Sequence, residues 1–166
     1  MLEVLKYPNP KLALKAQQVT QFDTNLRKTV EQMFATMYAE DGCGLAAIQV
    51  DIQKQIIVID ISNDSNEPLI LINPEITSTS GSQTSDEGCL SFPGLRINVT
   101  RPLNLTVKAQ DLDGQEFTLN ATDFLAKCID HECEHLNGQV FIKNLSRLKQ
   151  HLALKKLERY KKNYVE

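Results

Sequence analysis

Segments with the pattern of β-strands are grouped in the middle of this chain, and segments with the pattern of helices lie before and after them. A parallel sheet would instead need strands that alternate with helices along the chain. The sequence therefore predicts an α+β fold. Because 42% of the 166 residues are hydrophobic and 23% are charged, we expect a single domain that covers residues 1–166.

Three segments have helical patterns. Between Asp23 and Glu40, apolar residues recur at helical spacing, and Asp23 is a plausible N-cap. A second helix is predicted from about Thr122 to Leu136, where Asn137-Gly138 gives a stop signal. A last helix should begin at Ser146 and form the C-terminal end of the domain.

The strand patterns lie between these helices. The apolar run 56–61 predicts a buried strand, and a second strand should cover residues 69–73. Apolar and polar residues then alternate over 103–109, and a turn at 111–114 leads into 116–120. The last two segments therefore predict a β-hairpin with one face toward a core.

The charge and the cysteines limit the possible partners. A net charge of −3 argues against a surface organised around nucleic acid or anionic lipid, so we expect neither DNA nor a membrane as a partner. No apolar run approaches the length of a membrane span, and residues 1–6 lack the pattern of a signal peptide. The four cysteines are then expected to be free thiols or metal ligands in the bacterial cytoplasm.

The strongest chemical signal is the sequence His131-Glu132-Cys133-Glu134-His135. Because residues four apart share one helix face, both imidazoles can bind one metal ion. Glu132 would then lie beside a metal-activated water, where a carboxylate can accept and later return a proton. The alternative is an ordinary amphipathic helix whose histidines are exposed or hydrogen-bonded.

Two histidines leave a catalytic metal site one protein ligand short. We favour Cys89, because its thiolate would complete the set and leave a fourth position open for water. The rival ligand is Cys128, which shares the helix face of His131 but could equally be a small buried residue. Cys133 points largely away from the predicted metal and is expected in the core.

The segment from Gly42 to Gln49 places two glycines at a helix end and one amide among small apolar residues. Glycines permit close approach of the backbone to a ligand. Gln49 could donate an N–H to an oxyanion that develops on a reacting carbonyl. The alternative is a helix C-cap followed by a packed loop in which Gln49 is merely solvated.

Glu87 and Arg96 flank the predicted sulfur ligand. A carboxylate two residues before Cys89 could pair with the guanidinium of Arg96 and fix the loop. An exposed ion pair without consequence is the other interpretation.

Three motifs occur in order: Gly-Cys-Gly-Leu-Ala-Ala-Ile-Gln, Glu-Gly-Cys-Leu-Ser and His-Glu-x-x-His-Leu-x-Gly. Together they resemble the signature motifs of bacterial peptide deformylases. The resemblance extends to residues 4–10, to residues 71–74 and to the helical tail, which is nearly the whole chain. It implies that the active-site helix is held at the centre of the fold, among β-strands.

The resemblance also implies the metal site. By motif position, the metal ligands would be Cys89, His131 and His135. One divalent ion per chain is expected, ferrous iron in the cell, with zinc, nickel or cobalt able to bind the same ligands. Imidazole and thiolate accept several late divalent metals, so the sequence itself selects none of them.

The same resemblance implies a reaction. A water activated by the metal would attack the formyl group of an N-terminal formyl-methionine, while Gln49 and the backbone N–H of Leu90 stabilise the oxyanion. Glu132 would protonate the departing amine, and the products would be formate and a nascent peptide with a free amino terminus. The peptide is expected to bind extended beside a strand edge. The expected substrate-binding residues are Gly42, Cys43, Gly44, Leu45, Glu87 and Arg96.

Two positions depart from the family pattern, which has Gln before the first histidine and Asp before the second. Here they are Asp130 and Glu134. Their carboxylates are four residues apart on the helix and would repel if both were ionised and unpaired. We therefore expect cationic or hydrogen-bonding partners for both.

Two other functions are compatible with parts of the pattern. A zinc endopeptidase could use the same helix with a downstream third ligand, but only His151 remains beyond His135. A non-catalytic module could retain the metal for structure, although structural zinc sites normally have four protein ligands.

The tail, residues 146–166, is predicted to be a basic amphipathic helix. Its positive residues are Arg147, Lys149, Lys155, Lys156, Arg159, Lys161 and Lys162. With Glu158 as the one acidic residue, residues 147–162 carry a charge of +6. An apolar stripe is expected at Leu148, Leu152, Leu157, Tyr160 and Tyr164. The basic face could contact ribosomal RNA, as the resemblance implies, or simply be solvated.

Overall fold

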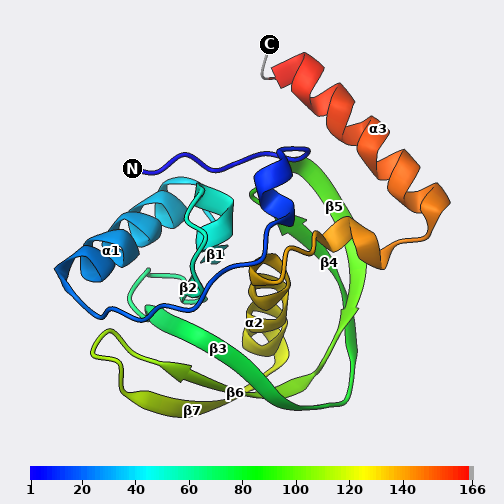
Figure 1. Ribbon diagram of the computed structural model, residues 1–166. Coiled ribbons are helices and arrows are strands. Elements are labelled where there is room, and N and C mark those ends of the chain that lie inside the picture. Colours follow the sequence, from blue (N-terminus) through cyan, green and yellow to red (C-terminus); the bar gives the residue numbers. More distant parts are fainter. Residues whose placement is uncertain (165–166) are drawn as a thin grey trace.

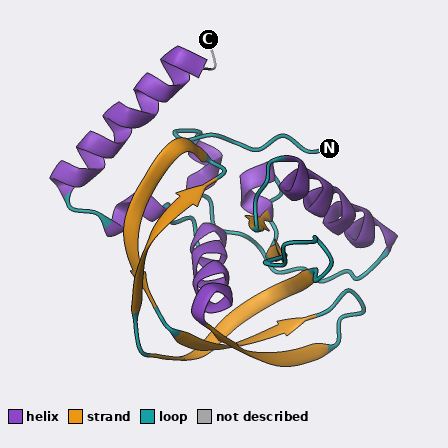
Figure 2. Ribbon diagram, turned by 180° about the vertical axis from the view of Figure 1, so that it is seen from behind, coloured by secondary structure: helices purple, strands orange, loops and turns teal. Residues whose placement is uncertain are grey.

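The computed structural model describes residues 1–164 and has an α+β fold, as predicted. Helix α2 (Asp123–Leu136) lies at the centre, with β-strands around it (Figure 1). Helix α1 (Thr24–Ala39) covers one side, and α3 (Arg147–Tyr164) extends along the outside next to β5 (Figures 1 and 2). Within this part of the chain, no helix is both long enough and apolar enough to cross a membrane.

The described strands form two antiparallel sheets, one with the order β1-β2-β3-β6-β7 and one that pairs β4 with β5. The larger sheet contains β1 (Gly44–Ala46), β2 (Ile56–Ile59), β3 (Leu69–Ser80), β6 (Asn104–Gln110) and β7 (Glu116–Thr122). The smaller sheet contains β4 (Gln83–Cys89) and β5 (Phe92–Arg101). Single 3₁₀ turns cover Pro10–Ala13, Ala47–Val50 and Phe141–Asn144.

Local signals account for the elements that were predicted well. The Asp23 carboxylate accepts a hydrogen bond of 3.0 Å from the N–H of Leu26, so it caps α1. Helix α2 ends at Asn137, and Gly138 adopts a φ of +74°, a conformation that favours glycine. The predicted hairpin is confirmed as β6 and β7.

Other strand predictions were incomplete. Strand β3 continues seven residues beyond Asn73, through Pro74, and β2 ends at Ile59 rather than at residue 61. The β4–β5 hairpin was not predicted at all. Its strands contain Gly88, Pro93 and Gly94, which are residues that strand patterns disfavour.

Strand β2 separates two cores and thereby fixes the position of α2. Ile57 and Ile59 face the core that contains α2, whereas Ile56 and Val58 face the core that contains α1. Because successive side chains of a strand point to opposite faces, one apolar run serves both cores. Helix α2 is therefore held between the sheets, with one side left for the cavity described below.

The predicted apolar stripe of α3 was wrong in part. Leu157 is buried, but Leu148 and Leu152 are 69% and 55% exposed, and Ala153 is buried beside Leu157 instead. Positions 153 and 157 lie one turn apart on a face well rotated from that of 148 and 152. The side chain of Tyr164 lies outside the part that the structure describes.

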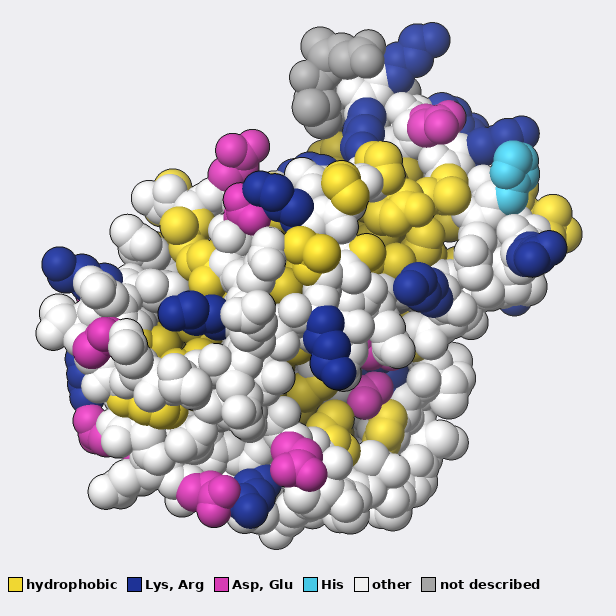
Figure 3. Space-filling model, viewed as in Figure 1, with side chains coloured by type: hydrophobic (Ala, Val, Ile, Leu, Met, Phe, Trp, Pro, Cys, Tyr) yellow, Lys and Arg dark blue, Asp and Glu magenta, His cyan; other side chains and the backbone are white. Residues whose placement is uncertain are grey.

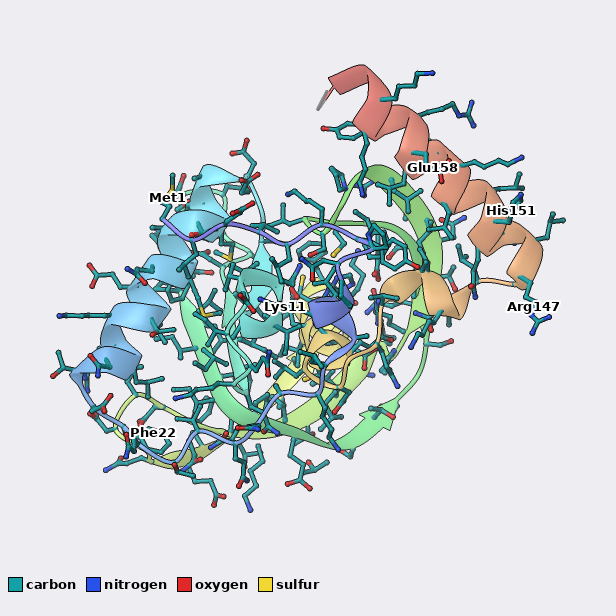
Figure 4. All side chains as sticks on the ribbon, turned by 45° about the horizontal axis from the view of Figure 1, so that its top comes forward. Met1, Lys11, Phe22, Arg147, His151 and Glu158 are labelled. Carbon is teal, nitrogen blue, oxygen red and sulfur yellow. The ribbon has the colours of Figure 1, made fainter. Side chains whose placement is uncertain are left out.

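The basic character of α3 is retained at its surface. Lys and Arg side chains cover much of its outward side (Figure 3), and Arg147 and His151 project away from the domain (Figure 4).

Candidate active site

A cavity of about 610 Å³ opens beside α2. Its walls are the segment after α1, the end of β4, the start of β5, and α2 itself. Tyr160 of α3 also lines it, and a Cβ added at Gly94 would lie 2.2 Å from the Tyr160 ring, so α3 packs directly on the cavity rim. The next residue of α3, Lys161, donates a hydrogen bond to the backbone carbonyl of Tyr7.

Cys89, at the end of β4, meets His131 and His135 of α2. One ligand atom of each lies within 4.8 Å of the others, and Cys89 Sγ is 3.3 Å from His135 Nε2. Ligands around a tetrahedral zinc ion, with bonds of about 2.0–2.3 Å, are separated by about 3.5 Å, so this arrangement fits a metal ion. Cys128 belongs to no such group among residues 1–164.

Glu87 orients His131 from the side opposite the cysteine. His131 Nδ1 lies 3.1 Å from Glu87 Oε1, so an N–H at Nδ1 can donate to the carboxylate and leave Nε2 free for a metal. Arg101 Nη2 is 3.1 Å from the same nitrogen, but a guanidinium cannot accept a hydrogen bond. Burial lowers the pKa of His131, yet its hydrogen bonds to Cys89 and Glu87 raise that pKa well above its usual value.

Arg101, at the end of β5, is only 2% exposed and holds three carboxylates. Its Nε lies 2.8 and 3.0 Å from the two oxygens of Glu87, and its Nη1 lies 3.0 Å from both Asp130 Oδ2 and Glu134 Oε1. The prediction that Asp130 and Glu134 need a cationic partner is confirmed. Because one guanidinium serves three carboxylates, negative charge remains in excess behind His131, which favours a bound cation.

This network also shifts the pKa values of its members. Burial raises the pKa of Glu87, but the hydrogen bonds from His131 and Arg101 outweigh it and hold that pKa below the usual range. For Arg101, burial lowers the pKa, and the carboxylates of Glu87 and Glu134 raise it further than burial lowers it. All the charged forms are thus stabilised by one another.

The predicted pairing of Glu87 with Arg96 was wrong. Arg96 Nε binds Asp86 Oδ2 at 2.6 Å in an exposed pair, whereas Glu87 is buried and binds Arg101. Neighbouring residues of β4 point to opposite faces of the hairpin, so Asp86 and Glu87 cannot share a partner. Arg96 stands opposite Gly88 and still lines the cavity.

Glu132 lies inside the cavity wall and is 4% exposed. Its Oε1 has no hydrogen-bond partner within the described structure. Strand β1 packs against the same carboxylate, because a Cβ added at Gly44 would be 2.7 Å from Glu132 Oε2. Burial raises the pKa of Glu132 to about 7, close to the value that suits proton transfer at neutral pH.

His135 differs from His131 in its surroundings. It is 1% exposed, and its Nδ1 has no hydrogen-bond partner within residues 1–164. Burial, together with repulsion from His131 and Arg101, lowers the pKa of His135 well below its usual value. The neutral form, which is the form that binds a metal, is therefore favoured.

Gln49 is buried rather than solvated, with 1% exposure. Its Oε1 accepts a 2.9 Å hydrogen bond from the N–H of Ala46, which fixes the orientation of the amide. Its Nε2 lies 3.2 Å from Ser91 Oγ and 3.6 Å from Cys89 Sγ. The amide thus points its N–H groups toward Cys89, the candidate sulfur ligand, where a reacting carbonyl could approach.

The predicted substrate-binding residues of the segment 42–45 differ in burial. Gly42, Cys43 and Gly44 line the cavity together with Leu90, and a Cβ added at Gly42 would be 2.9 Å from the Leu90 side chain. Leu45 is fully buried in the core next to α1, so only its backbone could contact a substrate.

Two thiols meet at the same wall. Cys43 Sγ lies 3.7 Å from Cys128 Sγ. The hydrogen bond with Cys128 lowers the pKa of Cys43 to about 7, and the same contact together with burial raises the pKa of Cys128. Cys133 is half-buried beside the core, broadly as expected.

Sequence reasoning missed Arg101, Ser91 and Tyr160. Arg101 had a detectable signal, because it ends the alternating inward series Leu95, Ile97 and Val99 and so falls on the buried face of β5. An arginine in that register implies buried acidic partners. Tyr160 was predicted in the apolar stripe of the tail helix, but its place at the cavity rim was not, since that depends on the tertiary structure.

Three candidate metal ligands cluster beside one cavity, next to a carboxylate oxygen of Glu132 that has no partner within residues 1–164, and this combination is that of a metal-dependent hydrolase. The family model for polypeptide deformylase matches residues 1–151. The chain is 46% identical to a peptide deformylase of Azotobacter vinelandii over 160 residues, which cover 96% of this chain and 95% of that protein. It therefore belongs to the polypeptide deformylase family.

Solved structures agree with this assignment. A peptide deformylase from Legionella pneumophila superimposes with a TM-score of 0.96 at 38% identity, covering 100% of this chain and 98% of that one. A peptide deformylase from Synechococcus elongatus in complex with actinonin gives a TM-score of 0.90 at 43% identity, covering 93% and 86%.

Proposed function

We propose that this enzyme removes the formyl group from the N-terminal formyl-methionine of nascent polypeptides and releases formate. The observation that carries the proposal is the buried carboxylate of Glu132, whose Oε1 lacks a partner beside the Cys89, His131 and His135 cluster. Family membership supplies the substrate class. We infer that the enzyme works in the bacterial cytoplasm, because nascent chains with formyl-methionine emerge there.

Cys89, His131 and His135 would hold one divalent metal ion. The ion would lower the pKa of water and polarise the formyl carbonyl. We infer ferrous iron as the ion in the cell from the family alone, and zinc, nickel and cobalt as substitutes, because a mixed thiolate and imidazole set accepts each of these metals. The acidic surplus around Arg101 supports binding of a cation, since it increases the basicity of the His131 imidazole.

Glu132 would move the protons of the reaction. Its unpaired oxygen can accept a proton from the attacking water and return that proton to the leaving nitrogen. Gln49 Nε2 and the backbone N–H of Leu90 would donate to the oxyanion, and the hydrogen bond between Gln49 Oε1 and Ala46 holds the amide ready for this role.

The peptide would bind as an extended strand. Among the described strands, β1 pairs with β2 alone and borders the cavity at Gly44, so a peptide could pair with its other edge there. Gly42 and Cys43 would lie beside the methionine, and Arg96 beside later residues. If N-methylation of the peptide bonds after formyl-Met left the kinetics unchanged, this mode of binding would be wrong.

The exposed face of α3 is a candidate ribosome contact. Residues 147–162 carry a charge of +6, and contacts with RNA phosphates weaken steeply as salt rises. Replacement of the exposed lysines by glutamine should reduce co-sedimentation with ribosomes at low salt without unfolding the domain. Equal binding by both proteins across a salt series would leave α3 as a structural helix.

The direct test measures formate released from a formyl-Met peptide by metal-loaded protein. A zinc endopeptidase would instead cleave internal peptide bonds, and a non-catalytic module would do neither. Formate release that disappears with a chelator and returns with added metal is the expected result.

The sulfur ligand is tested separately by metal content. Cys89→Ser should lose most of the bound metal, because it removes a thiolate from a three-ligand set. Cys128→Ser is the matched control, since that thiol lies on α2 near His131 but outside the cluster. Loss of metal from the Cys128 variant alone would refute the assignment.

A further inference from the structure

A pair of thiols lies in the cavity, apart from the three candidate metal ligands. Cys43 Sγ and Cys128 Sγ are 3.7 Å apart, and both residues line the cavity. Cys43 belongs to the segment that joins α1 to β1, whereas Cys128 belongs to α2. The contact therefore joins two elements that form different walls of the cavity.

We propose that Cys43 and Cys128 form a reversible disulfide that inhibits the enzyme when a peroxide is present. A disulfide has an S–S bond of about 2.05 Å, so the two sulfurs need to approach each other by about 1.7 Å from their present contact. The two thiols thus form a site of oxidative modification, and the oxidant is a peroxide.

The chemistry uses only these two thiols and hydrogen peroxide. The thiolate of Cys43 attacks the O–O bond, forms an S–O bond, and releases hydroxide that becomes water with one proton. The sulfur of Cys128 then attacks Cys43, the S–O bond breaks, and the departing hydroxide takes the Cys128 proton to form a second water. The two thiols together lose two electrons and two protons, and the peroxide is reduced to two waters.

Cys43 is the thiol that reacts first. It is half-buried and reached through the cavity, whereas Cys128 is 7% exposed. The thiolate rather than the thiol is the nucleophile, and the hydrogen bond from Cys128 favours the thiolate at Cys43. A small dithiol reverses the change by thiol–disulfide exchange and restores both thiols.

Inhibition follows from the residue next to Cys43. Gly44 packs so closely on Glu132 that a Cβ there would be 2.7 Å from Oε2. A bond that draws Cys43 toward α2 therefore displaces the carboxylate that would transfer protons. Because displacements of about 1 Å can reduce turnover about a hundredfold, we expect at least a roughly tenfold loss of kcat.

The test uses zinc-loaded enzyme, because zinc has no redox chemistry of its own. The protein is treated with a small excess of hydrogen peroxide, alkylated with iodoacetamide without reduction, and digested for mass spectrometry. We expect a peptide pair joined through Cys43 and Cys128 that lacks two hydrogen atoms, a kcat reduced at least about tenfold, and recovery of kcat with dithiothreitol at unchanged zinc content.

Two variants are compared with their own untreated samples. Cys43→Ala should lose the linked peptide and the reversible inhibition, whereas Cys133→Ala should behave as the wild type, because Cys133 lies outside the pair. Zinc content and the unfolding transition report whether each variant is folded. The kcat readout rests on the proposed function, but the linked peptide does not.

Three outcomes would overturn the proposal. Peroxide could inactivate the enzyme through Cys89 with no linked peptide, the link could form without any loss of kcat, or Cys43→Ala could still be inhibited reversibly.

Discussion

His131 and Glu132 are neighbours on α2, yet their side chains lie in opposite kinds of environment. On the side of His131, each polar side chain has a partner near 3 Å, because Arg101 binds Glu87 and Glu87 accepts from His131. On the side of Glu132, a buried carboxylate oxygen has no partner in the described structure. The difference agrees with the proposed roles, in which the paired side would position the candidate ligands and the unpaired side would receive a substrate and its water.

The two sides also differ in energetic terms. A buried polar atom that stays without a hydrogen bond costs about 1–3 kcal/mol, so Glu132 Oε1, which has no protein partner within residues 1–164, is suited to bind water or substrate. Arg101 shows the reverse case, because loss of Arg101 or of its buried partner Glu87 would leave a buried charge without its main partner. Substitutions on the unpaired side should therefore alter chemistry, and substitutions on the paired side should alter stability and metal binding.

The largest effect is expected from Glu132→Gln. The amide keeps the size and polarity of the side chain but cannot accept the proton, so kcat should fall about 10²–10⁴-fold. Metal content should stay near that of the wild type. Glu134→Gln is the control, since that carboxylate faces Arg101, and it should retain most of its turnover. Near-normal kcat in metal-loaded Glu132→Gln would show that the unpaired carboxylate of Glu132 has no role in proton transfer.

Next in size is Arg101→Met. Loss of the guanidinium leaves the buried Glu87 without its main partner, and the free energy of unfolding should fall by about 3–5 kcal/mol. Because Glu87 also orients His131, metal affinity should fall about 10–100-fold. Urea unfolding and metal titration measure the two effects. If Arg101→Met matched the wild type in both, the network would have no positioning role.

A smaller effect is expected from pH. The pKa of Glu87 in the folded state lies below the usual value of 4.5, so its stabilising contribution is present above that pH. The contribution is lost as pH falls through the lower, folded-state pKa. We therefore expect the difference in unfolding free energy between metal-free wild type and Glu87→Gln to shrink on acidification below about pH 4.5. A difference that grows under these conditions would contradict the assigned shift.

The smallest effect is expected from Arg96→Ala. This residue lies on the same hairpin as Arg101, but its pair with Asp86 is exposed, and such pairs contribute about 0–1 kcal/mol. Urea unfolding should place the variant within that range of the wild type. If Arg96→Ala lowered the free energy of unfolding as much as Arg101→Met, burial would not explain the difference between the two arginines.

The spacing of apolar residues was sufficient to predict those elements whose local sequence agrees with their place in the fold. The alternation in β6 and β7 and the stop at Gly138 predicted a hairpin and the end of α2, because these choices depend on neighbouring residues. The candidate metal cluster was predicted from helix geometry and motif order. Its three candidate ligands are brought together by the structure.

The β4–β5 hairpin was missed, although alternation over Leu95, Ile97 and Val99 marks part of β5. Its buried face includes Glu87 and Arg101, which a polarity pattern assigns to solvent, and they satisfy each other only after folding. The error at Glu87 had the same origin, since nearness in sequence suggested Arg96 while strand alternation selected Arg101. In α3, helical spacing was correct, but the side that packs on the domain was not determined by the sequence pattern alone.

The contact between Gly44 and Glu132 limits which substitutions this enzyme can accept when an inhibitor selects for resistant variants. A side chain at 44 would collide with the carboxylate at 2.7 Å, whereas one at Gly42 would meet the end of the Leu90 side chain, which can rotate away. In a library that encodes every amino acid at both positions, surviving clones should keep glycine at 44 and accept small residues at 42. Resistance to an inhibitor bound in this cavity would then arise around Gly42 and Leu90, while the wall at Gly44 would offer no viable escape.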